Sequence, residues 1–234
     1  MNEKEFITKV SDLGIVLNDK QINQFRKYYE LLVEWNNKMN LTAITEKEAV
    51  YEKHFYDCLL TSQIYNFTDQ RICDVGAGAG FPSVPLKIVY PHIKVVIVDS
   101  LEKRINFLNK LAGELELSNF EAIASRAEDY VKIEREKFDL VLARAVARLN
   151  ILSELCIPLV KVDGDFIALK GKQGMLEHEE ANEGILKLGA RLSTMKKYYL
   201  DSDESTRYLI RYHKFEKTNI KYPRNFGQIK KKPL

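Results

Sequence analysis

The sequence predicts an α/β protein built on a mainly parallel seven-stranded sheet, with helices on both faces and a helical extension before it. Three observations predict this fold. Apolar residues recur at helical spacing up to about residue 68. Short β-rich runs then alternate with helical runs from Arg71 onward, and the last two β-rich runs have no helix between them. Strand–helix alternation is typical of parallel strands, and the final pair is typical of an antiparallel hairpin at the sheet edge.

Two helices account for the extension. Residues 19–40 form the first, capped by Asn18 or Asp19, and residues 46–65 form the second, after a turn at 40–42. The apolar stripe of the first helix is typical of core packing, and its members are Ile22, Phe25, Tyr29, Leu32 and Met39.

The remaining elements follow in order. We expect strands at 71–75, 94–99, 120–125, 138–143, 166–170, 191–200 and 206–215, and helices at 85–89, 102–117, 151–160 and 175–188. Asp201 to Asp203 form the turn of the last hairpin. This order favours the methyltransferase variant of the doubly wound fold. We therefore expect a helical extension over 1–68, the sheet domain over 69–216 and a basic tail over 217–234.

Composition limits the class of protein. The 234 residues include 36 Lys and Arg against 33 Asp and Glu, and 45% of them are apolar, which is enough for a substantial core. No apolar run approaches the ~18 residues of a membrane span. The three cysteines form no CxxC pair, and the four histidines show no metal-ligand spacing. We expect a soluble, cytoplasmic, monomeric protein without a metal.

A glycine-rich segment joins the first strand of the sheet to its first helix. It reads DVGAGAGFP from Asp74 to Pro82, and its glycines let backbone N–H groups approach a ligand. The spacing is GxGxG, whereas dinucleotide-binding proteins use GxGxxG and P-loop proteins use GxxxxGK[ST]. A carboxylate beside the loop suits a cationic or zwitterionic ligand better than a pyrophosphate. The segment therefore favours S-adenosylmethionine, with Asp74, Gly76 and Gly78 at the site.

Two further acids extend this site. Asp99 ends the second strand, where a carboxylate can accept hydrogen bonds from ribose hydroxyls, and Glu128 follows the third strand, toward the adenine. Either acid alone could instead cap a helix. Together with the glycine loop, at the ends of successive parallel strands, they indicate a cofactor site.

The end of the fourth strand restricts the methyl acceptor. It reads LARAVAR, so Arg144 stands where methylases of exocyclic amines carry an Asn/Asp-Pro-Pro-aromatic motif. Neither Cys73 nor Cys156 is well placed as the thiolate that C5 methylation requires. Guanine N7 has a free lone pair and no proton to lose, so its methylation needs neither base nor nucleophile. Arg144 could orient the guanine, the cofactor carboxylate or a phosphate.

Basic residues gather at the same predicted edge of the sheet. They follow the second, third, fourth and fifth strands, and they are Lys103, Arg104, Arg126, Arg144 and Lys170. We expect them to form one cationic rim that binds RNA. The segment 217–234 adds six basic residues and no acidic one, with Arg224 among them; the alternative for this segment is a solvated tail.

Several motifs together resemble the RsmG (GidB) family of bacterial proteins. They are WNNKMNLTAI at 35–44, HFYDCL at 54–59, the glycine loop, VDSLEKR at 98–104, ARAV at 143–146, YPRNFG at 222–227 and KPL at 232–234. The resemblance implies an S-adenosylmethionine-dependent enzyme that makes 7-methylguanine in 16S ribosomal RNA near the decoding site, acting on the RNA or on the small ribosomal subunit.

The resemblance also implies site residues. The family's cofactor contacts fall on Gly76, Phe81, Ala127, Glu128 and Arg144, and its basic patch falls on the five residues of the expected rim. Ser83 stands where the family often has glycine, and Cys58 and Ser125 are smaller departures. Two other functions remain open, a methyltransferase of a small molecule or protein, and a non-catalytic ribosome-assembly factor that keeps a cofactor pocket.

Overall fold

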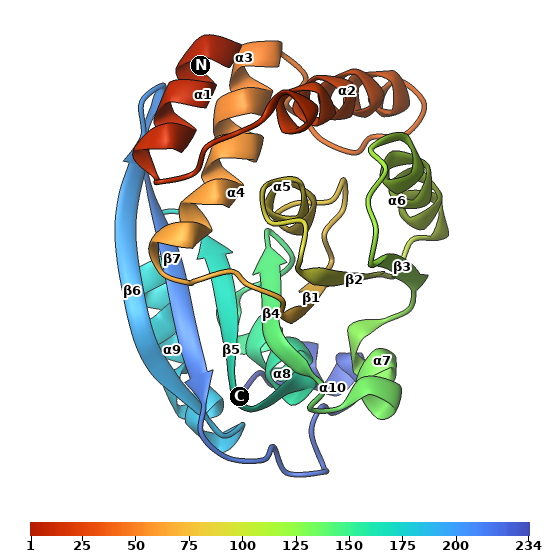
Figure 1. Cartoon of the computed structure of the whole chain (residues 1–234). Helices are drawn as coiled ribbons and strands as arrows, with labels where there is room; N and C mark the ends of the chain where they lie inside the picture. Colours follow the sequence, from red (N-terminus) through yellow and green to blue (C-terminus); the bar gives the residue numbers. More distant parts are fainter.

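A single seven-stranded sheet forms the centre of the computed structural model, which describes residues 1–202 and 206–234 (Figure 1). The strand order is β3-β2-β1-β4-β5-β7-β6, in which the first five are parallel and the last two pairings are antiparallel. The strands are β1 (Arg71–Val75), β2 (Lys94–Asp99), β3 (Phe120–Ala124), β4 (Phe138–Arg144), β5 (Val160–Lys170), β6 (Ala190–Leu200) and β7 (Asp203–Lys214). The predicted fold class is confirmed. Of the turn expected at 201–203, Asp201 and Ser202 form the turn and β7 begins at Asp203, whose side chain lies outside the described residues.

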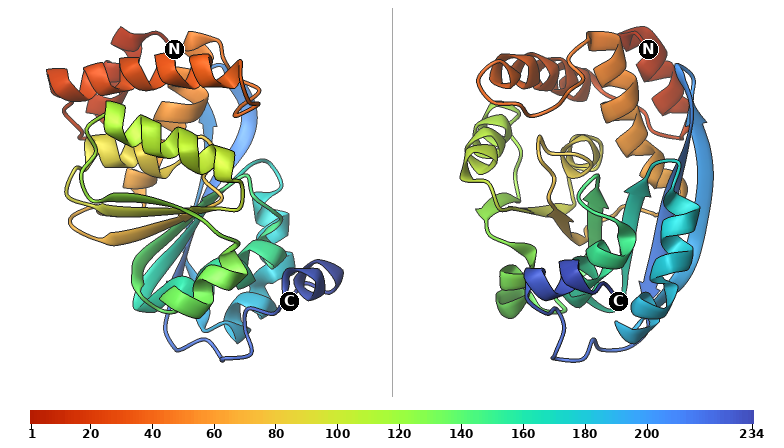
Figure 2. Two further views of the ribbon diagram at one scale, coloured as in Figure 1. Left: turned by 90° about the vertical axis from the view of Figure 1, so that its right-hand side faces the viewer. Right: turned by 180° about the vertical axis from the view of Figure 1, so that it is seen from behind.

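Helices cover both faces of this sheet (Figure 2). On one face lie α5 (Ser83–Val89), α6 (Glu102–Glu114) and the N-terminal helices α1 (Glu3–Asp12), α2 (Asp19–Asn36), α3 (Lys47–Val50) and α4 (Asp57–Leu59). On the other lie α7 (Ala127–Glu134), α8 (Leu149–Cys156), α9 (Gly174–Lys187) and α10 (Phe226–Lys231). Between α3 and α4 runs the π-helix η1 (Tyr51–Tyr56), and two short 3-10 helices are η2 (Leu60–Gln63) and η3 (Ile157–Leu159).

The central strands are buried on both faces because helices cover both. Successive side chains of a strand point to opposite faces, so Ile72 enters one hydrophobic core and Cys73 enters the other. The first core also contains Phe6, Phe25 and Phe55 from the N-terminal helices. The expected extension over 1–68 therefore shares its core with the sheet.

Local hydrogen bonds explain where α2 begins and ends. Asn18 and Gln21 form a capping box at its start, with the Asn18 side chain accepting from the Gln21 backbone N–H. The helix ends at Asn36, four residues before the expected end, because the Asn36 side-chain oxygen accepts from the backbone N–H groups of Leu41 and Thr42 at 2.8 and 2.9 Å. The fully buried tyrosine of this helix is Tyr28, whereas the predicted stripe placed Tyr29 there.

The segment 217–234 is packed against the sheet domain. Ile229 of α10 is fully buried, and the Arg224 guanidinium pairs with the buried carboxylate of Glu154 in α8, Nη2 to Oε2 at 2.6 Å. The Arg224 backbone N–H donates to the same carboxylate at 2.8 Å. The segment 217–234 is therefore docked on the sheet domain, and the alternative interpretation as a solvated tail is wrong.

Candidate cofactor and substrate site

A cavity of about 400 Å³, here called cavity A, lies at the carboxyl ends of β1 and β2 and beside the start of α7. Parallel strands bring their carboxyl ends to one edge, where ligands of open α/β sheets bind. Four of the predicted cofactor residues line it: Gly76, Asp99, Ala127 and Glu128. Phe226 of α10 also lines cavity A, so the docked C-terminal segment forms part of its wall.

Gly76 shapes the wall of cavity A. It has φ of +72°, and a Cβ on it would lie 2.7 Å from Cγ2 of Val146. Its N–H donates to the Val98 carbonyl at 2.8 Å, which ties the start of the loop to β2. Only glycine suits this combination of backbone conformation and close approach.

Asp99 is held by three donors. Its Oδ1 accepts from the Leu101 N–H at 3.0 Å, and its Oδ2 accepts from Arg104 Nη1 at 3.1 Å and from the Gly78 N–H at 3.3 Å. A carboxylate offers about four lone-pair sites. Asp99 therefore keeps acceptor capacity for a hydroxyl in cavity A, in a fixed orientation.

Three predicted cofactor residues do not line cavity A. Of the described residues that line cavity A, none is Asp74, Gly78 or Phe81. Asp74 is fully buried and its Oδ2 accepts from the Ser83 N–H at 3.0 Å. Burial raises the pKa of Asp74 to about 7. The Ser83 departure therefore lies at a position whose backbone anchors the loop through Asp74.

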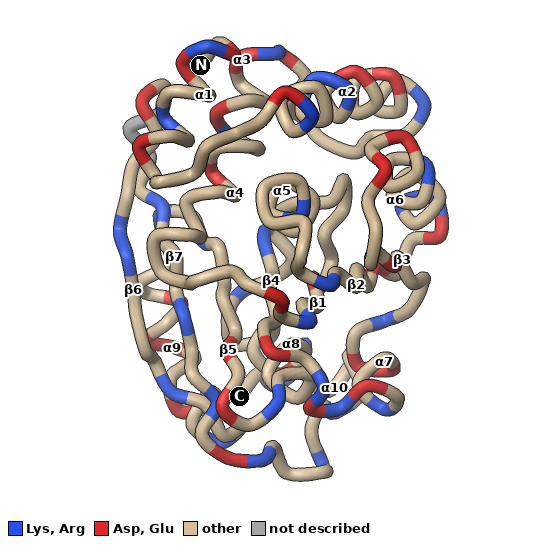
Figure 3. The backbone as a smooth tube through the Cα atoms, viewed as in Figure 1, with Lys and Arg blue, Asp and Glu red and all other residues tan. Residues whose placement is uncertain are grey.

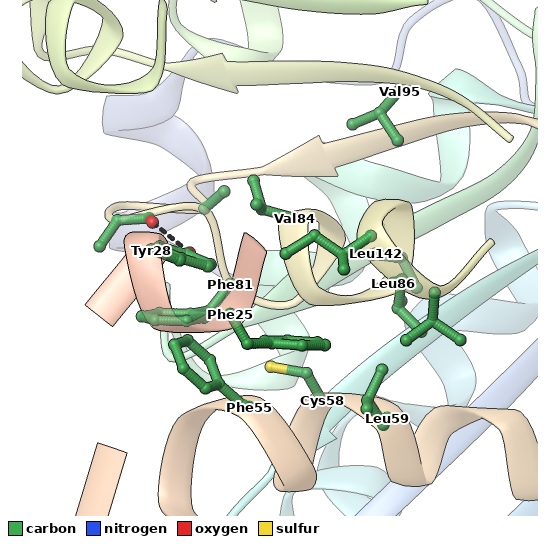
Figure 4. Close-up of a cluster of buried hydrophobic side chains, with 14 of the residues drawn as sticks. Phe25, Tyr28, Phe55, Cys58, Leu59, Phe81, Val84, Leu86, Val95 and Leu142 are labelled. Carbon is green, nitrogen blue, oxygen red and sulfur yellow. Dashed lines mark hydrogen bonds between the residues drawn. The ribbon is translucent and has the colours of Figure 1, made fainter. Parts of the chain in front are cut away.

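Helix α2 packs directly on the glycine loop (Figure 4). The Tyr28 hydroxyl donates to the Ala79 carbonyl at 2.6 Å, and the Tyr28 ring stacks on Phe81 with centroids 5.5 Å apart. A Cβ on Gly80 would lie 2.9 Å from the Tyr28 oxygen. Sequence reasoning missed Tyr28, because a tyrosine on an apolar helix stripe carries no signal of a contact 51 residues away.

A second cavity of about 270 Å³, here called cavity B, lies at the ends of β4 and β5. Ala145, with φ of +56°, lines both cavities, so the two lie side by side. The residues lining cavity B are Ile44, Lys53, His54, Asp57, Arg144, Ala145, Leu169, Lys170, Gly171, Glu177, Tyr198 and Arg207. Arg144 is therefore placed in cavity B, beside cavity A.

Arg144 is turned inward by a buried carboxylate. Its Nη1 lies 2.9 Å from Oδ2 of Asp57, and the guanidinium lies over the Phe81 ring at 5.0 Å. Asp57 also accepts from the Tyr198 hydroxyl at 2.6 Å and lies 3.6 Å from Arg207 Nη1. The hub at Asp57 thus joins the N-terminal helices to β4, β6 and β7. Sequence reasoning missed the hub, although Asp57 stands within a motif that carried the resemblance.

His54 is a neutral member of the same network. Burial and the neighbouring Arg144 lower the pKa of His54 to about 3. Arg144 Nη2 lies 2.7 Å from Nδ1, and the Thr42 hydroxyl lies 2.8 Å from Nε2. Nδ1 also lies 3.1 Å from the Lys53 carbonyl, so neighbouring polar groups engage both ring nitrogens. The ring stacks on Phe81 with centroids 4.5 Å apart.

Basic and acidic residues are interspersed along the chain (Figure 3). The side chains of the predicted cationic rim divide into two groups. Lys103 is exposed, the Arg126 side chain is 63% exposed, and Arg104 reaches Asp99 at the mouth of cavity A. Arg144 and Lys170 instead point into cavity B, because buried carboxylates hold them there. The expectation of five side chains on one open rim is corrected in this respect.

Thiol and metal chemistry have little support among the described residues. All three cysteines are buried, and burial raises the pKa of each thiol above its usual value. No group of three or more His, Cys, Asp or Glu in the described part of the chain is arranged to hold a metal ion. Over the same residues, no helix is both long enough and apolar enough to cross a bilayer.

Solved structures share the fold at low sequence identity. A 16S rRNA (adenine(1408)-N(1))-methyltransferase from Catenulisporales acidiphilia superposes with a TM-score of 0.54 at 15% identity, over 68% of this chain and 88% of that chain. A branched-chain polyamine synthase from Thermus thermophilus gives a TM-score of 0.59 at 12% identity, over 82% and 65%. The second protein is not named as a methyltransferase, so this likeness shows the fold alone.

Sequence comparison goes further than the fold. The family model described as rRNA small subunit methyltransferase G, GidB, matches residues 21–206. A protein of Macrococcus caseolyticus named ribosomal RNA small subunit methyltransferase G is 54% identical over all of this chain and 99% of its own length. Proteins of the same name from Bacillus cereus strains are 53% identical over the same shares. The chain therefore belongs to the GidB family of small-subunit rRNA methyltransferases.

Proposed function

We propose that this chain transfers a methyl group from S-adenosylmethionine to N7 of a guanine in 16S rRNA, near the decoding site. The observation that carries the proposal is the pair of adjacent cavities, which share Ala145, in a chain that belongs to this family. Cavity A has the features of a cofactor site, and cavity B offers a polar pocket beside it. We further propose that the protein acts as a monomer in the cytoplasm, on the RNA or the small subunit.

The residues of cavity A fit S-adenosylmethionine. Gly76 leaves the backbone open where a Cβ would meet Val146, Asp99 keeps acceptor capacity for ribose hydroxyls, and Glu128 lies at the far end. The bound cofactor supplies a methyl group on a positively charged sulfur. The protein holds it in place, and Gly78 and Phe81 act through the loop that Tyr28 supports.

An acceptor that needs no base agrees with the groups in cavity B. N7 of guanine has a lone pair and no proton, so the protein must only position the base. His54 has both ring nitrogens engaged and Asp57 is held by Arg144, so neither is poised to take a proton. We assign Arg144 a catalytic role in positioning the base and the methionine end of the cofactor. Lys103, Arg104, Arg126 and Lys170 are the proposed RNA-binding residues, whereas Arg224 is committed to Glu154 and is proposed to hold the C-terminal segment in place.

The test is methyl transfer from labelled S-adenosylmethionine to small ribosomal subunits from cells that lack this protein, followed by mapping of 7-methylguanine. A single modified guanine near the decoding region is the expected result. Transfer only to a small molecule or a protein would contradict the RNA substrate. If the protein is instead an assembly factor, the wild type and D99A, which lacks the Asp99 carboxylate in cavity A, should restore ribosome assembly equally well in cells that lack the protein. Neither should methylate the RNA.

A further inference from the structure

Cavity B contains a buried ion pair outside the Asp57 hub. Lys170, at the end of β5, lies with its Nζ 2.6 Å from Oε2 of Glu177 in α9, and their side chains are only 8% and 12% exposed. Both residues line cavity B together with Ala145, which also lines cavity A. An ion pair at this position would contact a substrate bound in cavity B beside the proposed cofactor site.

Glu177 keeps one oxygen available to a ligand. Its Oε2 forms the ion pair with Lys170 Nζ and accepts a hydrogen bond from the Leu149 N–H at 2.8 Å. Among the described residues, none donates to its Oε1. The other carboxylate that lines cavity B belongs to Asp57, whose Oδ1 is taken by Tyr198 and whose Oδ2 is taken by Arg144. Glu177 therefore supplies the open acceptor.

Lys170 keeps one donor available. An ammonium carries three N–H bonds. One donates to the Ala147 carbonyl at 2.8 Å, and the ammonium is also ion-paired with Oε2 of Glu177. An N–H bond of Lys170 that is not directed to Ala147 can therefore donate to a ligand in cavity B. The pair thus presents one donor and one acceptor side by side.

We propose that Lys170 and Glu177 recognise the target base as guanine, with Lys170 Nζ donating to O6 and Glu177 Oε1 accepting from N1–H. Guanine carries this acceptor and this donor on neighbouring atoms, whereas adenine carries a donor at N6 and an acceptor at N1. An adenine in the same place would set its amine against the ammonium and its N1 lone pair against the carboxylate. The inference rests on the proposed function.

The arrangement leaves the reacting atom free. N7 adjoins O6 on the side away from N1, so neither side chain of the pair binds N7. Ala145 lines both cavities, so a base held in this way lies beside the proposed cofactor site. The volume of cavity B, about 270 Å³, is at the low end for ligand pockets and suits a single base better than an extended ligand.

E177Q separates recognition from folding. The glutamine oxygen can still accept from the Leu149 N–H, so the start of α8 keeps its partner. The amide NH₂ then faces the cavity and opposes the N1–H of guanine, donor against donor. We expect kcat/KM for guanine to fall about 10- to 100-fold. E180Q is the matched control. Glu180 lies on the same helix as Glu177, pairs with Arg148 and does not line cavity B.

The measurement uses small subunits reconstituted with ligated 16S rRNA that carries guanine, inosine or 2-aminopurine at the methylated position. Inosine keeps O6 and N1–H, and 2-aminopurine lacks both but keeps N7. We expect the wild type and E180Q to accept guanine and inosine and to discriminate strongly against 2-aminopurine. E177Q should reduce the ratio of kcat/KM for guanine to that for 2-aminopurine at least 10-fold, since its amide can donate to N1 of 2-aminopurine.

A purely structural role for Glu177 would lower kcat/KM for all three bases alike and leave their ratios unchanged, which would overturn the inference. Equal methylation of guanine and 2-aminopurine by the wild type would also overturn it, while leaving the proposed function intact. If the wild type methylates no subunit at all, the proposed function fails, and the inference fails with it.

Discussion

Arg144 Nη1 and Asp57 Oδ2 lie 2.9 Å apart, and this contact joins the end of β4 to the N-terminal helices. The two side chains are 14% and 2% exposed, so the ion pair is largely removed from water. Arg144 also donates to the Lys53 carbonyl at 3.2 Å. The N-terminal helices thus form one wall of cavity B, and the position of Arg144 depends on them.

Replacing Asp57 by Asn should destabilise the fold. D57N keeps the shape of the side chain but leaves the buried Arg144 guanidinium without its countercharge, at a cost of about 3 kcal/mol. Urea unfolding measures this change. D69N, at an exposed position near the end of the extension, is the control and should stay within about 0.5 kcal/mol of the wild type. Equal stability of D57N and D69N would contradict the role of the ion pair.

Y28F should weaken the glycine loop. The fully buried Tyr28 hydroxyl is the donor to the Ala79 carbonyl, and a carbonyl that loses its donor in the interior costs about 1–3 kcal/mol. Denaturant unfolding and calorimetric binding of S-adenosylhomocysteine would both show the loss. Y29F is the matched control, because the Tyr29 hydroxyl donates to Thr45 at an exposed position. A Y28F protein as stable as Y29F would show that the hydrogen bond from Tyr28 to Ala79 does not stabilise the glycine loop.

Local sequence patterns predicted β1 and β2 with the bounds that the structure gives, and they placed Gly76 and Asp99 at cavity A. These features depend on strand alternation, glycine spacing and chain order, and residues close together in the sequence determine all three. The Asp57 hub is different, since Arg144 is 87 residues from Asp57 and Tyr198 is 141 residues from it. No local pattern specifies which buried charges meet.

The docking of the C-terminal segment could not be predicted from local sequence patterns either. A run of cations without acids is typical of a solvated tail, and nothing near Arg224 in sequence shows that Glu154 lies buried 70 residues earlier. The ion pair turns Arg224 inward and brings Phe226 to cavity A. Long-range charge pairing, which periodicity does not encode, decided both placements.

D99N should reduce cofactor affinity. Asp99 faces cavity A, and an amide in its place loses one acceptor and sets a donor against a ribose hydroxyl or the Gly78 N–H. We expect Kd for S-adenosylhomocysteine to rise about 10- to 100-fold, in line with ~1.5–3 kcal/mol for hydrogen bonds to a charged group. Isothermal titration calorimetry measures it. D129N, on the exposed side of α7, should bind like the wild type; a D99N protein that also did so would remove Asp99 from the cofactor site.

Asp74 should make the protein less stable as the pH rises from about 4 to 7. Its pKa is raised to about 7 in the fold and is ~3.9 in the unfolded chain, so over this window the folded state binds the proton and the unfolded state releases it. D74N has no such proton. The unfolding free energy of D74N minus that of the wild type should therefore increase by about 3 kcal/mol between pH 4.5 and pH 7.5.

His54 acts in the opposite direction, which is why the difference between variants is the useful quantity. With its pKa lowered to about 3, His54 stays neutral in the fold while the unfolded chain gains its proton below about pH 6.5, so its contribution to stability is lost on acidification. Both proteins carry His54, and its effect cancels in the subtraction. A D74N difference that is constant across this range would mean that Asp74 is ionised in the fold.

The exposed cations at the mouth of cavity A should govern the salt dependence of RNA binding. Lys103 and the largely exposed Arg126 are free to reach phosphates, and each phosphate contact contributes about one unit to the slope of log K against log salt. The double variant K103A/R126A should bind small subunits more weakly at low salt, with a slope reduced by about two. Filter binding at several salt concentrations measures the slope, and calorimetry with S-adenosylhomocysteine measures the cofactor affinity separately, because Arg126 also lines cavity A. K230A/K231A, with two cations on α10 away from the lining of both cavities, is the control for total charge. Equal slopes for the two double variants would mean that net charge attracts the RNA, with no dedicated contact at the cofactor mouth.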